Sequence, residues 1–208
     1  MTLRGVSWSP LLMATAMGTL ILAGCVAFAE DLPPLLYLRL GLAALAGAAA
    51  FVLDEPAAAA VDAAPTTLRS RTTARVTVVA VPLAVWVAGV VSIDGRIPQT
   101  PAGHLLVEGA GVLAVTVALA AVLRQTGRSA PGEGVATVMG GVVLGLATFR
   151  SFPRSVPLFP AGEGWVASTT LWCALGALSV VVVLASTRDS HRRIRTGGAG
   201  EVIRPGRT

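Results

Sequence analysis

Long apolar runs alternate with short polar stretches along the whole chain. Because a run of about twenty apolar residues is long enough to cross a bilayer as a helix, each long run predicts a membrane span. The predicted spans are residues 11–29, 35–53, 76–93, 105–123, 135–149 and 165–186. The fifth is the shortest, and Gly140, Gly141 and Gly145 interrupt it. It could cross with little tilt, thin the bilayer or be re-entrant, and the Gly141–Gly145 spacing suits close helix packing.

The first apolar run also has features of a secretory signal sequence. Ala27-Phe28-Ala29 has the form of a signal-peptidase site, and Leu22-Ala23-Gly24-Cys25 resembles a lipoprotein cleavage box. The run is long for a signal peptide, however, and few basic residues precede it. We therefore favour an uncleaved first helix.

Composition places the chain in a membrane and excludes several kinds of chemistry. Apolar residues make up 54% of the sequence and charged residues 13%, and the mean hydropathy is +0.74. A soluble protein could not cover its surface with so few charges, so we predict an all-α, multi-pass protein of the bacterial inner (plasma) membrane. All 16 basic residues are arginine. Without lysine there is no phosphate-binding P-loop and no Schiff-base chemistry, and we predict neither an enzyme nor a cofactor.

The arginines predict the topology. With six spans and the N-terminus inside, twelve of the 16 arginines fall in cytoplasmic segments, as the positive-inside rule requires. Both termini are then cytoplasmic, and the basic segment 187–208 is predicted to be a disordered tail. Arginines in the cytoplasmic segments beside the lipid bilayer account for the net charge of +5. No nucleic-acid partner is therefore expected.

Few polar side chains lie within the spans. Arg39 is predicted to reach the membrane interface or to meet Glu30 and Asp31. His104 and Glu108 are four residues apart and share a helix face, which suits an interfacial helix cap; proton handling is the alternative. The serines and threonines of the spans are expected to bond to backbone carbonyls or to neighbouring helices rather than to act as nucleophiles; examples are Thr116, Ser168 and Ser179.

The segment between the second and third spans is the most distinctive part of the chain. Asp54 or Glu55 can cap a short helix that begins at Pro56 and ends before Pro65, because proline suits the first turn of a helix and breaks its interior. Three arginines then precede the next span. The segment is either a solvated loop or a docking element for a partner. Its candidate docking residues are Asp54, Glu55, Pro56, Asp62, Pro65, Arg69, Arg71 and Arg75.

The order of these residues resembles that in small actinobacterial membrane subunits of the ABC-2 type of ABC transporter permease. The resemblance rests on Leu53-Asp54-Glu55-Pro56-Ala57-Ala58 and on Ala64-Pro65-Thr66-Thr67-Leu68-Arg69, and it extends loosely to the six-span layout. It implies that residues 54–75 contact a separate ABC ATP-binding subunit, and that a second permease subunit or a second copy completes the exporter. The alternative is an accessory or scaffold protein that binds a membrane partner through the same segment.

Overall fold

The computed structural model describes residues 8–28, 33–54, 75–96, 101–126, 130–148, 158–160 and 164–188. These residues form six α-helices and two short 3₁₀ turns, which confirms the predicted all-α class for this part of the chain. The helices are α1 (Trp8–Ala27), α2 (Pro34–Ala50), α5 (Ala80–Ile93), α6 (Ala102–Gln125), α7 (Gly132–Thr148) and α8 (Trp165–Arg188). The turn η2 (Phe51–Leu53) extends α2, and η3 (Thr77–Val79) leads into α5.

Four of these helices are long and apolar enough to cross a membrane: Trp8–Ala27, Pro34–Leu53, Ala102–Gln125 and Trp165–Ser186. The chain is therefore a multi-pass membrane protein. Thr77–Ile93 and Gly132–Thr148 are apolar but shorter. The 17 residues of α7 make a helix about 26 Å long, slightly less than the roughly 30 Å of a bilayer core. The weak fifth run thus forms a single helix, which begins three residues earlier than its predicted start.

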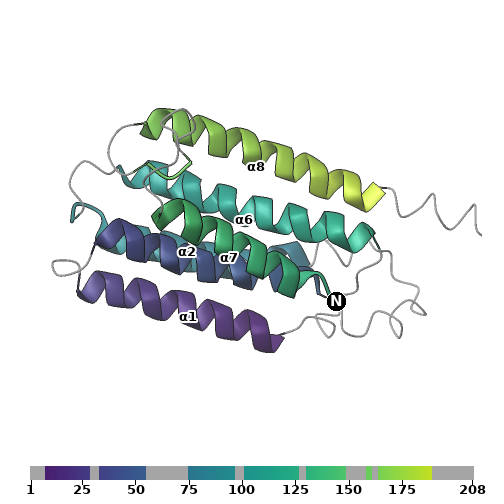
Figure 1. Cartoon of the computed structure of the whole chain (residues 1–208), viewed down its shortest axis with the longest axis horizontal. Coiled ribbons are helices and arrows are strands. Elements are labelled where there is room, and N and C mark those ends of the chain that lie inside the picture. Colours follow the sequence, from purple (N-terminus) through teal and green to yellow (C-terminus); the bar gives the residue numbers. More distant parts are fainter. Residues whose placement is uncertain are drawn as a thin grey trace, which may run out of the picture.

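The helices lie side by side, and successive helices run in opposite directions (Figure 1). Helix α2 is the centre of the bundle, because it packs against α1, α5, α6 and α7. Helix α6 also packs against α5, α7 and α8. Figure 1 shows α1 and α8 on opposite sides of this centre. Large apolar side chains are exposed on both outer helices, among them Met13, Leu20, Val166 and Val181, as lipid-facing surfaces require.

Glycines allow the central helices to approach each other closely. A Cβ on Gly18 of α1 would lie 2.8 Å from Leu45 of α2, and a Cβ on Gly41 would lie 2.8 Å from Leu22. The predicted role of Gly141 and Gly145 in packing is wrong, since a Cβ at either position would meet no atom within 4 Å. Neither glycine therefore brings α7 into close contact with a neighbouring described helix.

The two ends of the bundle differ in their polar groups. We call them the Arg39 end, where α1 and α5 end and α2, α6 and α8 begin, and the Asp54 end, which is opposite. Arg75 and Arg124 lie at the Asp54 end, whereas Arg96 lies at the Arg39 end and donates to the carbonyl of Val26 at 2.9 Å. The arginines alternate between the ends as the antiparallel order of the spans predicts.

Candidate functional sites at the two ends of the bundle

A buried ion pair joins the two central helices at the Arg39 end. Nε of Arg39 lies 3.0 Å from Oε1 of Glu108, and Nη2 lies 3.1 Å from Oε2. This two-bond geometry is the strongest that arginine and a carboxylate form. The side chains are 4% and 1% exposed, so neither charge faces lipid or water directly. The pair therefore joins α2 to α6 as a neutral unit.

The ion pair lies inside the apolar helices rather than at their tips. Arg39 is five residues beyond the start of α2 and Glu108 six beyond the start of α6, which places both charges about 8–9 Å along their helices. Arginine in mid-membrane costs about 2.5–3.5 kcal/mol on insertion scales, and pairing with a carboxylate offsets this cost. Two predictions are therefore wrong: Arg39 is buried instead of reaching the interface, and Glu108 is its partner instead of a helix cap.

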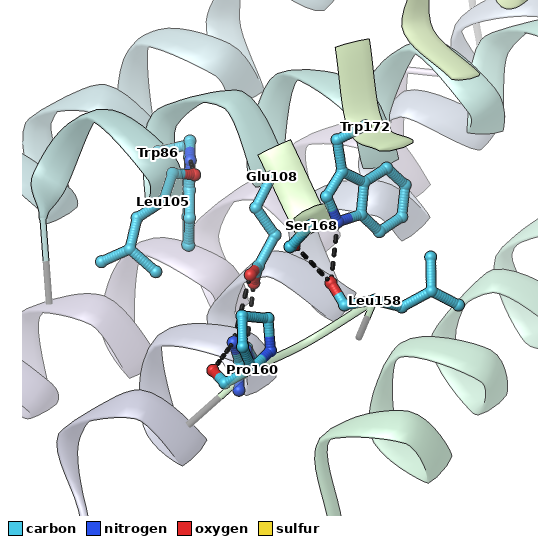
Figure 2. A network of polar contacts seen from close by, with 8 residues as sticks. Trp86, Leu105, Glu108, Leu158, Pro160, Ser168 and Trp172 are labelled. Carbon is cyan, nitrogen blue, oxygen red and sulfur yellow. Dashed lines mark hydrogen bonds and ion pairs between the residues drawn. The ribbon is translucent and has the colours of Figure 1, made fainter. Parts of the chain in front are cut away.

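A short segment, Leu158–Pro160, lies against the ion pair. Nη2 of Arg39 also donates to the carbonyl of Pro160 at 2.7 Å, and the guanidinium carbon lies 5.1 Å from the centre of the Phe159 ring. The second of these contacts is a cation–π interaction. The Glu108 carboxylate and the Pro160 carbonyl thus both accept from the same guanidinium, and Figure 2 shows Glu108 and Pro160 close together.

Helix α8 holds the same segment from its other side. The carbonyl of Leu158 accepts hydrogen bonds from Nε1 of Trp172 at 2.8 Å and from Oγ of Ser168 at 3.1 Å. Figure 2 shows both side chains converging on this one oxygen. The rings of Phe159 and Trp172 lie 5.5 Å apart between centroids. Leu158–Pro160 is therefore bonded to α2 through Arg39 and to α8 through Trp172 and Ser168.

His104 lies one turn from Glu108 but has different neighbours. Its Nδ1 contacts the hydroxyl of Thr169 on α8, and its ring is 6.0 Å from that of Trp165. Helix α6 has no side-chain cap at Pro101, so the predicted capping role of His104 is wrong. The indole nitrogen of Trp165 is buried without a hydrogen-bond partner.

The hydroxyl groups of the spans behave as predicted. Thr116 donates to the carbonyl of Val112 at 2.8 Å, and Ser179 donates to that of Leu175 at 2.7 Å. Ser168 also bonds to a backbone carbonyl, that of Leu158. No group of three or more His, Cys, Asp or Glu residues suited to a metal ion occurs in the described part of the chain.

At the Asp54 end, a carboxylate closes the start of α7. Oδ1 of Asp54 accepts a hydrogen bond from the backbone N–H of Gly132 at 2.7 Å. This N–H is one of the groups that a helix leaves unpaired at its start. A Cβ on Gly132 would lie 2.6 Å from Oδ2 of Asp54 and 2.6 Å from Cδ1 of Phe51, so only glycine fits here without displacement. Asp54 therefore caps α7; the short helix predicted at Pro56 lies outside the described residues.

Arg75, at the other boundary of the 54–75 segment, contacts Asp54. Its side chain is buried, and its Nη1 donates to the carbonyl of Asp54 at 3.5 Å. The two boundary residues of the 54–75 segment are thus in contact. Burial raises the pKa of the Asp54 carboxyl above its usual value, although the Gly132 N–H and the Arg124 charge act in the opposite direction.

Most of the predicted docking residues have no described position. Glu55, Pro56, Asp62, Pro65, Arg69 and Arg71 lie outside the described residues, as does 189–208 of the predicted tail. Only Asp54 and Arg75 are described, and both are turned inward. The sequence predicted separate roles for Arg39 and Glu108 and did not predict that they pair.

Comparisons with protein-family models, with curated proteins and with solved structures give no match to this chain.

Proposed function

We propose that this protein is a six-span membrane subunit of an ATP-driven exporter, whose 54–75 segment receives force from a separate ABC ATP-binding subunit. The Asp54 end faces the cytoplasm in this proposal, and both termini lie there. A second permease subunit or a second copy of the chain completes the transport pathway. The protein itself hydrolyses nothing.

The contact between the ends of the 54–75 segment carries this proposal. Asp54 follows the central helix α2 directly, and Arg75 leads into α5 through η3. Because Asp54 also holds the first residue of α7, a displacement of the segment acts on α2, α5 and α7 together. Helix α2 in turn packs against α1 and α6. A partner that pushes here therefore moves the core of the bundle rather than a loose loop.

Co-purification in mild detergent tests the proposal. The chain, expressed in its native host, is expected to recover an ATP-binding subunit whose ATPase activity requires the complex. Glu55→Ala/Asp62→Ala is expected to reduce this recovery, because it removes two acids of the segment but keeps the Asp54 cap. Glu133→Ala is the matched control, since Glu133 is an exposed acid at the same end but outside the segment. Recovery of another membrane protein without an ATPase would support the scaffold alternative instead.

Thiol labelling tests the orientation. In a background with Cys173→Ser, which removes an exposed native thiol, Asp62→Cys is expected to react with an impermeant reagent only after the inner membrane is opened. Asp94→Cys, in the exposed turn at the Arg39 end, is expected to react in intact spheroplasts. The reverse pattern would contradict both the topology and the exporter proposal.

A further inference from the structure

Helix α8 is attached to the bundle in two distinct ways. Along its length it packs against α6, where the ring of Trp172 lies against Gly111: a Cβ there would be 2.7 Å from Cε3 of Trp172. Most of α8 is otherwise exposed, since only 17% of its apolar window is buried inside the protein, against 61% for α2 and for α6. Its second attachment is the polar one through Leu158–Pro160.

This second attachment crosses to the central helix. Trp172 and Ser168 bond to the carbonyl of Leu158, and two residues later the carbonyl of Pro160 bonds to Arg39 of α2. Phe159 lies between them, in contact with the rings of Trp172 and the guanidinium of Arg39. We call Leu158–Pro160 the strap. Figure 2 shows Leu158 beside Trp172 and Pro160 beside the carboxylate of Glu108.

Glu108 determines whether Arg39 can hold the strap. Its two oxygens accept from Nε and from Nη2, and Nη2 also donates to the Pro160 carbonyl, so the carboxylate fixes the direction of that donor. A guanidinium without this carboxylate would be an unpaired charge among apolar helices, and it would turn toward water. The ion pair therefore does more than neutralise two charges, because it orients the donor that the strap needs.

We infer that the Arg39–Glu108 pair and the strap form a latch that closes the Arg39 end of the bundle by tying α8 to α2. Release of the latch lets α8 move away from α2 at this end, with the α6–α8 packing as its pivot. The Asp54 end, which has no strap contact, keeps its spacing. This device does not depend on an ATPase partner, so its test is separate from that of the proposed function.

Distances between spin labels on α1 and α8 test the latch. With Cys25 and Cys173 replaced by alanine, Phe28→Cys and Val166→Cys place labels on exposed positions at the Arg39 end. Leu12→Cys and Val181→Cys provide an exposed reference pair at the Asp54 end. Double electron–electron resonance in lipid nanodiscs then gives one distance distribution for each end of the same bundle.

Two variants remove the contacts of the latch, one on the α2 side of the strap and one on the α8 side. Arg39→Met/Glu108→Leu removes the ion pair without leaving a buried charge, which favours a folded product. Trp172→Phe/Ser168→Ala removes both donors to the Leu158 carbonyl and keeps an aromatic ring beside Phe159. In both variants the Phe28–Val166 distances are expected to shift to longer values and broaden, while the Leu12–Val181 distances stay as they were.

Trp86→Phe/Ser179→Ala is the matched control. It removes an indole donor to a carbonyl, Trp86 Nε1 to Leu105 at 3.0 Å, and a buried serine hydroxyl, but it leaves the strap intact. No shift is expected at either end. Failure of either latch variant to lengthen the Phe28–Val166 distances would overturn the latch, as would an equal shift at both ends or the same shift in the control.

Discussion

The two ends of the bundle use carboxylates in opposite ways. At the Arg39 end, Glu108 is paired with a charge inside the apolar helices, and its partner is fixed in turn by a backbone carbonyl. At the Asp54 end, Asp54 lies just beyond η2 and accepts from the backbone at the start of α7. The first carboxylate neutralises a charge; the second completes a helix. Loss of the first is therefore expected to cost far more than loss of the second.

The largest loss of stability is expected when only one partner of the buried ion pair is replaced. Glu108→Ala leaves the Arg39 charge without its carboxylate partner, and removing one partner of such a pair typically costs about 3–5 kcal/mol. The free energy of unfolding in mixed micelles is expected to fall by about this amount. Arg39→Met/Glu108→Leu should lose much less, because neither charge is then left unpaired. Equal losses in the single and double variants would contradict a coupled pair.

The next largest effect concerns the close contact between α5 and α6. A Cβ on Gly109 would lie 2.0 Å from Nε1 of Trp86, which is bonded to the carbonyl of Leu105. Gly109→Ala must therefore displace this indole, and overpacking of this kind costs about 1–3 kcal/mol. Gly103→Ala on the same helix meets no atom within 4 Å and is the control. A thermal unfolding midpoint lowered by Gly109→Ala but unchanged by Gly103→Ala would confirm the packing.

At the Asp54 end, the cap is expected to contribute less. Asp54→Ala removes the acceptor for the Gly132 N–H, and loss of a helix cap costs about 1 kcal/mol. Asp54→Asn keeps an oxygen acceptor and should retain most of the stability. Hydrogen exchange at the first turn of α7 measures the effect locally: it should be faster in Asp54→Ala and nearly unchanged in Asp54→Asn. Faster exchange in both variants would show that the charge, rather than the hydrogen bond, holds α7.

The sequence predicted the helices well and the ion pair poorly. Apolar runs alone locate all six α-helices of the described residues, because a chain in lipid must satisfy its backbone hydrogen bonds within each segment. The partner of Arg39 could not be read from the chain, since Glu108 is 69 residues away. One signal was present: the two charges lie at nearly equal depth from the start of two spans that run in the same direction. Arg39 was instead predicted to reach the membrane interface or to meet the acids nearest in sequence, Glu30 and Asp31.

The same limitation applies to Asp54. The local pattern of an acid followed by proline predicted that Asp54 or Glu55 caps a helix at Pro56, which lies outside the described residues. It did not predict that Asp54 caps α7. Gly132 lies 78 residues further on, and only the packing of α7 against α2 brings its N–H within reach. The strap was likewise beyond prediction, because its contacts use the backbone carbonyls of Leu158 and Pro160, which every residue type provides. Sequence patterns identify elements and local caps; contacts between distant elements need the packed bundle.

The smallest expected effect is a dependence of stability on pH at the Asp54 end. Burial raises the pKa of Asp54 above its ordinary 3.8, against the opposing influence of the Gly132 N–H and Arg124. The folded protein therefore binds a proton here more tightly than the unfolded chain does. The resulting stabilisation is complete below 3.8 and is lost as the pH rises through the raised pKa of the folded state.

The thermal unfolding midpoint of the wild-type protein is accordingly expected to decline as the pH rises from about 4 toward neutrality. Asp54→Asn removes this titration, so the difference between the two proteins isolates it from the other acids. The decline should be shallow, because the hydrogen bond and the arginine charge offset much of the burial. If the midpoint of the wild type instead rose relative to that of Asp54→Asn as the pH increases, the Gly132 hydrogen bond and the Arg124 charge would outweigh burial. Asp54 would then hold α7 mainly as an anion, as Glu108 holds Arg39.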